Sequence, residues 1–171
     1  MGILRMNSQP SLAMVPEFDI VAYSPNHERI LVVECKAGKE SSPLNAAVFR
    51  RNLFVHGFLP VTPFFMLAYP TKFYLWNQEQ PSELSPDSSP ARTSDFAASA
   101  RPVLTEYLGS WADETTALTT SGLETALLYW LSDLASDIRA PDPASEADKM
   151  LMDSGLYARI RFGKVASQVA R

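Results

Sequence analysis

The stretch from Pro16 to Lys36 constrains the fold of this chain more than any other. It contains two apolar or β-branched runs of strand length, Pro16–Tyr23 and Arg29–Lys36. Residues 24–28 between them have the composition of a turn. The pattern predicts an antiparallel hairpin, around which the rest of the chain has to fold.

One register of this hairpin brings two acidic residues together. If Tyr23 pairs with Ile30, Asp19 lies opposite Glu34. Because strand side chains alternate, Asp19, Glu34 and Lys36 then project from one face. Facing residues have Cβ atoms about 4.5–5.5 Å apart, and like charges at that spacing are destabilising. A cation between the two carboxylates removes this penalty, so the pair predicts a metal site.

The donor types indicate which metal this site would hold. Asp19 and Glu34 offer hard oxygen ligands, and the sequence has no His/Cys cluster, which favours Mg²⁺ or Mn²⁺ over zinc. Lys36, two residues after Glu34, would position an attacking water or stabilise a phosphorus transition state. Glu17 has the same strand parity as Asp19 and is a further candidate ligand.

A helix and two strands are predicted after the hairpin. Ser42-Pro43 has the residue types of an N-cap and a first helical position, and Gly57 those of a helix end. The Arg50-Arg51 pair falls at the flanks of this helix. The apolar runs 64–69 and 72–76 predict the strands. The sheet-facing stripe of the helix comprises Ala46, Phe49 and Leu53.

The second half of the chain is predicted to be a helical extension. Residues 77–95 are rich in Ser, Pro and acids without periodicity, which is typical of a surface linker. Residues 96–171 would then pack on a core formed by residues 1–76, within the same domain. Ser121–Glu124 matches a capping box that opens the strongest amphipathic helix. Its apolar positions are Leu123, Leu127, Trp130, Leu131, Leu134 and Ile138.

Composition and charge limit the class of protein. With 171 residues, of which 46% are hydrophobic, the chain can form one domain with a substantial core. It has neither a bilayer-length apolar run nor a signal-peptide pattern, so we expect a cytoplasmic protein without a membrane partner. The single cysteine, Cys35, reads as a small core residue. Residues 79–148 carry three Lys/Arg against thirteen Asp/Glu, so only the ends of the chain could supply a surface for a phosphate backbone. A solvated acidic face with a basic tail accounts for the same charges.

The hairpin residues resemble a known family. Asp19 followed by Val33-Glu34-Cys35-Lys36 resembles the PD-(D/E)XK, or restriction-endonuclease-like, nuclease superfamily. The predicted order is also similar: an Asp strand, a tight turn, a Glu-x-Lys strand, a capped helix and two strands. The resemblance covers about residues 14–76 and is greatest to small stand-alone bacterial members, including those similar to the N-terminal nuclease domain of type I restriction subunits.

This resemblance implies a fold, a chemistry and partners. The fold would be α/β, with an αβββαβ core whose mixed central sheet is flanked by helices. The activity would be Mg²⁺-dependent (or Mn²⁺-dependent) DNA endonuclease cleavage, in defence, repair or mobile-element processing. Asp19 and Glu34 would bind the metal with the backbone carbonyl of Cys35, and Lys36 would be catalytic.

The chain also departs from the family pattern. Members normally have a helix before the Asp strand, often with another metal-binding Glu, whereas few residues precede Asp19 here. We therefore expect a shortened start or a helix supplied by a partner subunit. Arg51, Asn52 and His56 are the candidates for a supporting role from the helix after the hairpin. Homodimerisation is a further expectation, because cutting both strands of a duplex usually takes two sites.

Two alternatives remain open at this point. The same three side chains could form an ordinary salt bridge on a solvated hairpin face. Four apolar residues assigned to that face argue that it is covered: Val21, Tyr23, Ile30 and Val32. The chain could also be a catalytically inactive nuclease-fold protein that acts as a binding or assembly subunit.

Overall fold

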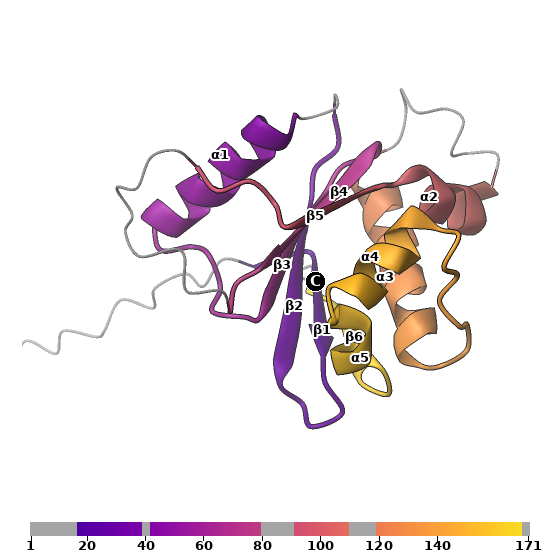
Figure 1. Cartoon of the computed structure of the whole chain (residues 1–171). Coiled ribbons are helices and arrows are strands. Elements are labelled where there is room, and N and C mark those ends of the chain that lie inside the picture. The colour runs from indigo at the N-terminus through magenta and orange to yellow at the C-terminus, as the bar shows by residue number, and fades with distance from the viewer. Residues whose placement is uncertain (1–16, 39–41, 80–90, 110–118, 169–171) are drawn as a thin grey trace, which may run out of the picture.

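A six-stranded mixed sheet separates two layers of helices in the computed structural model, which describes residues 17–38, 42–79, 91–109 and 119–168 (Figure 1). The strand order is β5-β4-β3-β2-β1-β6, and β2–β3 is the one parallel pair in this sheet. The elements are β1 (Ile20–Tyr23), β2 (Arg29–Cys35), α1 (Pro43–Val55), β3 (Phe64–Ala68), β4 (Lys72–Asn77), β5 (Phe96–Ser99), α2 (Arg101–Leu108), α3 (Thr120–Ala135), α4 (Glu146–Asp153), α5 (Leu156–Ile160) and β6 (Lys164–Ser167).

The predicted hairpin is present, with the predicted register over most of its length. Val21 faces Val32, as that register requires. A bulge after Ala22 then shifts the pairing, so that Tyr23 faces Arg29 rather than Ile30. The expectation that Ile30 shares a face with Val21 is therefore wrong, and Ile30 packs in the core on the other side of the sheet.

Helix α1 makes the crossover between the parallel strands β2 and β3. Its first turn is capped by the Ser42 hydroxyl, which accepts a hydrogen bond from the Asn45 amide at 3.1 Å, and Pro43 occupies the first helical position. The helix ends before Gly57, whose positive φ of 71° suits glycine. Both ends match the prediction, because local side-chain chemistry determines them.

Each face of the sheet has its own buried cluster. Helix α1 covers one face, and helices α2 to α5 cover the other (Figure 1). The α1-side cluster, which we call the α1-side core, contains Phe18, Val21, Val32, Ala46, Phe65, Leu67, Tyr69, Tyr74 and Trp76, with Phe49 and Leu53 packed against it. The other cluster joins alternate strand residues to the apolar stripe of α3. A sheet buried on both faces explains the nearly continuous apolar runs of its strands.

The C-terminal half is not wholly helical, because it adds both edge strands of the sheet. β5 pairs with β4, and β6 pairs with the free edge of β1 through Val21–Ala166 and its neighbours. Each of these strands has four residues, and in β6 only Val165 and Ala166 are apolar. Such short segments carry too little periodicity to be recognised from the sequence.

The start and end of α3 also differ from the prediction. The N-cap is Thr119, whose hydroxyl accepts a hydrogen bond from the Gly122 amide at 3.2 Å. The capping box predicted at Ser121–Glu124 is therefore wrong, and Glu124 lies inside the first turns of the helix. The helix ends at Ala135, so Ile138 lies beyond it and is 76% exposed rather than part of the stripe.

A fully buried carboxylate anchors the helical layer. Asp148 of α4 accepts hydrogen bonds from the Trp130 indole at 2.7 Å and from the Asp142 amide at 2.8 Å. It also forms an ion pair at 2.7 Å with Arg139, which in turn pairs with Glu106 of α2. Burying this charge is tolerated because every partner is a donor or a cation. The network ties α2, the end of α3 and α4 together.

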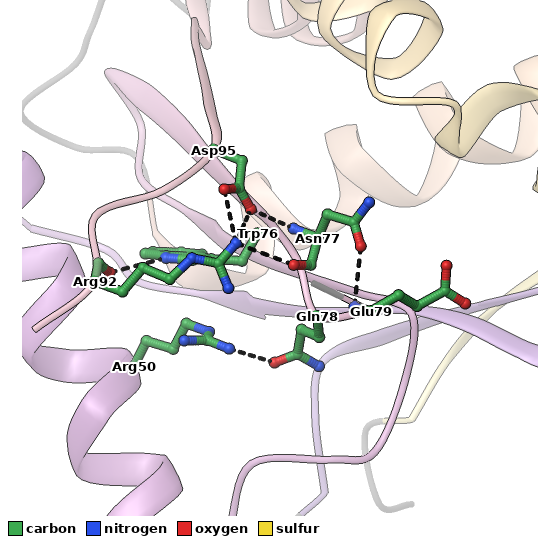
Figure 2. Close-up of polar contacts among 7 residues, drawn as sticks. All are labelled: Arg50, Trp76, Asn77, Gln78, Glu79, Arg92 and Asp95. Atoms are coloured by element: carbon green, nitrogen blue, oxygen red, sulfur yellow. Dashed lines mark hydrogen bonds and ion pairs between the residues drawn. The ribbon is translucent and has the colours of Figure 1, made fainter. Parts of the chain in front are cut away.

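The segment predicted as a linker, residues 77–95, is held at both described ends (Figure 2). The Arg92 guanidinium pairs with Asp95 and donates to the Asn77 carbonyl at 3.1 Å. The Trp76 indole donates to the Arg92 carbonyl at 3.1 Å. Residues 80–90 lie outside the described residues. The short stretches that flank them belong to the folded structure rather than to a free linker.

Arg50 of α1 is buried, contrary to its predicted place at the helix flank. It is 3% exposed, lies 5.5 Å from the Trp76 ring centroid and donates to the Gln78 side chain at 2.9 Å (Figure 2). The Gln78 amide group in turn donates to the Thr62 carbonyl at 2.9 Å. A guanidinium can be buried in this way because its planar face stacks on an aromatic ring.

Substitution of Gly163 tests whether the pairing of β6 with β1 is essential for stability. A Cβ at this position would overlap the Tyr23 carbonyl oxygen and lie 2.8 Å from that of Ile160. We expect Gly163→Ala to destabilise the protein by about 3 kcal/mol or more, because two backbone groups would have to move. The measurement is urea unfolding followed by circular dichroism. Gly57→Ala is the matched control, since nothing lies near its Cβ and only a positive-φ cost of roughly 1 kcal/mol applies.

Candidate functional site

Asp19 is fixed across the hairpin by its backbone and its side chain. It directly precedes β1, and its amide donates to the Val33 carbonyl at 3.1 Å. Its carboxylate oxygen Oδ2 accepts a hydrogen bond of 2.6 Å from the Cys35 amide. The ladder of paired residues ends with Ile20 opposite Val33, and Asp19 is close enough for its charge to act on Glu34. The first acid of the predicted site is thus held at the end of β2.

Glu34 and Lys36 form a close ion pair. The Lys36 Nζ atom lies 2.7 Å from Glu34 Oε1, and the two side chains are 38% and 19% exposed. The same Nζ atom lies 4.8 Å from the ring centroid of Phe49 on α1. The Glu34–Lys36 pair therefore lies on the α1 side of the sheet. The salt bridge considered as an alternative is present, but it lies beside a covered face rather than a solvated one.

Helix α3 brings a third acid to this site. Burial raises the pKa of the Glu124 carboxyl, and so do the charge of Asp19, a side-chain contact with Asp19 and the charge of Glu34. We call Asp19, Glu34 and Glu124 the acid cluster.

Sequence analysis missed Glu124 because it matched the last position of a capping box. A usable signal was nevertheless present. Glu124 follows the buried Leu123 and lies three residues before the buried Leu127, at the edge of the stripe that faces the sheet. At the edge of the apolar stripe of α3, an acidic side chain lies beside the sheet and not on the solvent-facing side of the helix.

Burial and neighbouring charges shift the pKa values of Glu34 and Cys35 at this site. Burial raises the pKa of Glu34, the contact and charge of Lys36 lower it, and the charge of Asp19 raises it, with a net upward direction. Burial also raises the pKa of the Cys35 thiol, which is 3% exposed, so Cys35 is a neutral core residue as predicted. The Lys36 ammonium is the cation in contact with Glu34.

The carboxylates of the acid cluster are suitable ligands for a hard divalent cation, but their side chains are not positioned to bind one in this structure. Carboxylate oxygens are the ligands that Mg²⁺ and Mn²⁺ prefer. Within the described ranges, no group of three or more His, Cys, Asp or Glu residues is arranged to hold a metal ion. Glu34 is already paired with Lys36, so a metal ion bound by Glu34 would compete with this ammonium.

The other candidate residues lie outside these contacts. Glu17 is exposed, and no contact described above involves it. On α1, Asn52 is exposed and Arg51 is half-buried. His56 caps the far end of the helix, where its ring lies 6.3 Å from that of Phe58. The contact between α1 and the acid cluster is therefore made by Phe49, whose ring lies against Lys36, and not by Arg51, Asn52 or His56.

Comparison with known proteins gives no independent assignment. No family model matches the chain, and no curated protein or solved structure is significantly similar to it. No helix in the described part of the chain is long and apolar enough to cross a membrane.

The raised pKa values of Glu34 and Glu124 predict how stability depends on pH. In metal-free protein the unfolded chain loses these protons first, near the ordinary glutamate pKa of 4.5, while the folded state still holds them. The free energy of unfolding should therefore fall as pH rises from that value through the folded pKa. The measurement is the melting temperature in EDTA across this range.

Two variants make this pH experiment decisive. Glu124→Gln removes one titrating group and should flatten the decline. Glu79→Gln is the control, because Glu79 is a 56% exposed partner of Arg159 and should leave the slope unchanged. Equal slopes for the two variants would contradict the acid cluster.

Proposed function

We propose that this protein hydrolyses phosphodiester bonds in DNA with Mg²⁺ or Mn²⁺, as a nuclease of the PD-(D/E)XK type. The observation that carries the proposal is the convergence of four side chains at one end of the sheet. Asp19, Glu34 and Lys36 come from the hairpin, and Glu124 comes from α3. A structural role alone does not account for the proximity of Asp19, Glu34 and Glu124, of which only Glu34 is paired with the Lys36 ammonium.

The topology supports the same reading. β1, β2, α1 and β3 follow one another as in the later part of an αβββαβ core. α3 and β6 come from the other end of the chain, and they supply a glutamate-bearing helix and a strand beside β1. In an αβββαβ core, a helix and a strand of this kind precede the Asp strand. In this proposal the second half of the same chain, rather than a partner subunit, provides them.

Each residue would have a distinct role in the reaction. Asp19, Glu34 and Glu124 would hold the metal, together with the Cys35 carbonyl that the resemblance implies. A bound Mg²⁺ lowers the pKa of a coordinated water and neutralises phosphate charge. The Lys36 ammonium would donate hydrogen bonds to the attacking water or to a phosphate oxygen as negative charge develops there.

Basic residues at the same end of the sheet favour a phosphate-bearing substrate. The carboxyl ends of β2 and β3 adjoin the start of β4, because the Lys36 amide donates to Ala68 and the Tyr69 amide to Lys72. Lys72 has the strand parity of Tyr74, which belongs to the α1-side core. Lys36 and Lys72 are therefore available along one side of the sheet for successive backbone phosphates.

The direct test is cleavage of single-stranded and duplex DNA in Mg²⁺ or Mn²⁺. Lys36→Met should lower kcat by roughly 10²–10³-fold without loss of the fold, because it removes a donor to the developing charge. Lys149→Met is the matched control, since this lysine is 59% exposed on α4 and pairs with Asp153. Full activity in folded Lys36→Met would refute the proposed mechanism.

Metal binding is tested separately by titration calorimetry with Mn²⁺. Asp19→Asn and Glu34→Gln should abolish detectable binding, and Glu124→Gln should weaken it about tenfold or more. Binding that does not depend on these residues, or no binding by the native protein, would instead favour the inactive nuclease-fold scaffold.

Substitution of Lys72 tests whether DNA lies along this side of the sheet. Lys72→Ala should weaken DNA binding equally for all sequences and reduce the salt slope of log Kd by about 1, because one phosphate contact is lost. The measurement is fluorescence anisotropy at several salt concentrations in Ca²⁺. An unchanged slope would place the DNA elsewhere.

A further inference from the structure

Lys36 has two attractive neighbours of different kinds. One is the Glu34 carboxylate, 2.7 Å from Nζ, and the other is the face of the Phe49 ring, whose centroid is 4.8 Å from the same atom. A cation within about 6 Å of an aromatic centroid is attracted by the ring quadrupole. Phe49 is itself held in place, because it packs against the α1-side core.

The two neighbours would respond differently to a metal ion. A divalent cation on Glu34 competes with the ammonium for the carboxylate and repels it. The lysine stem is flexible and the side chain is 38% exposed, so without another contact it would turn towards solvent. The Phe49 ring does not bind the metal. It also leaves the three N–H donors of Lys36 free for water or phosphate.

We propose that Phe49 is a positioning residue, whose ring face keeps the Lys36 ammonium beside the acid cluster when Glu34 is engaged by another cation. The kinetic consequence rests on the proposed nuclease function, whereas the contact itself does not. Phe49 thereby links α1, which otherwise only covers the sheet, to the chemistry at the end of β2.

The kinetic experiment separates positioning from packing. Phe49→Leu should lower kcat between about threefold and thirtyfold with KM little changed, since it removes the ring but keeps an apolar side chain. Phe49→Tyr, which retains a ring face, should recover most of the loss. Leu53→Ala is the matched control, because Leu53 packs against the same cluster one turn later. It should reduce stability without reducing kcat. A Phe49→Tyr variant as slow as Phe49→Leu, or a native-like Phe49→Leu, would overturn the proposal.

A spectroscopic experiment tests the contact without any catalytic activity. An ammonium stem that lies over a ring shows upfield-shifted Cε protons, which NMR of lysine-labelled protein detects. The shift at Lys36 should persist in Glu34→Gln, where the ionic partner is gone, and disappear in Glu34→Gln/Phe49→Leu. Loss of the shift in Glu34→Gln alone would show that the carboxylate does the holding and would overturn the inference. If the native protein fails to cut DNA while this shift persists, only the proposed function is refuted.

Discussion

The hydrogen bond from the Cys35 amide to the Asp19 carboxylate, at 2.6 Å, fixes the geometry on which the candidate site depends. It joins a side chain that precedes β1 to the backbone at the end of β2. A slip of one residue between these strands would turn every β2 side chain to the opposite face. Both faces of the sheet are buried under separate helical layers, so such a slip would place Glu34 and Lys36 among apolar residues. The packing of the whole domain therefore enforces this bond.

Two arrangements of acids in the described part of the chain contrast sharply, because Asp148 is fully buried whereas Asp19, Glu34 and Glu124 are half-buried. Asp148 has no exposed surface, yet an indole, a backbone amide and a guanidinium surround it, as expected for a structural carboxylate. The acid cluster has the opposite composition. Burial raises the pKa values of Glu34 and Glu124, and the charge of Asp19 adds to the increase for both. Clusters of this kind are typical of functional sites, because a fold gains no stability from them.

The sequence allowed the parts of the fold determined by local chemistry to be predicted. The turn of the hairpin, the Ser42 cap and the apolar strands β3 and β4 all follow from residue type and spacing. The proximity of Asp19 to Glu34 also follows, because the hairpin register brings the start of β1 to the end of β2. Features that depend on contacts distant in sequence could not be predicted. β6 is too short to show a pattern, the burial of Arg50 depends on Trp76, and Glu124 had a plausible local role as a cap residue.

The pairing of β6 with β1 has a consequence for how the protein is made. During synthesis, the hairpin leaves the ribosome well before α3 and β6. A growing chain therefore holds Asp19 and Glu34 beside an unpaired strand edge, with neither Glu124 nor the final strand in place. Contacts that join such distant segments form late and slowly. Under the proposed function, the DNA-cleaving site would be assembled only after α3 and β6 have packed against the hairpin.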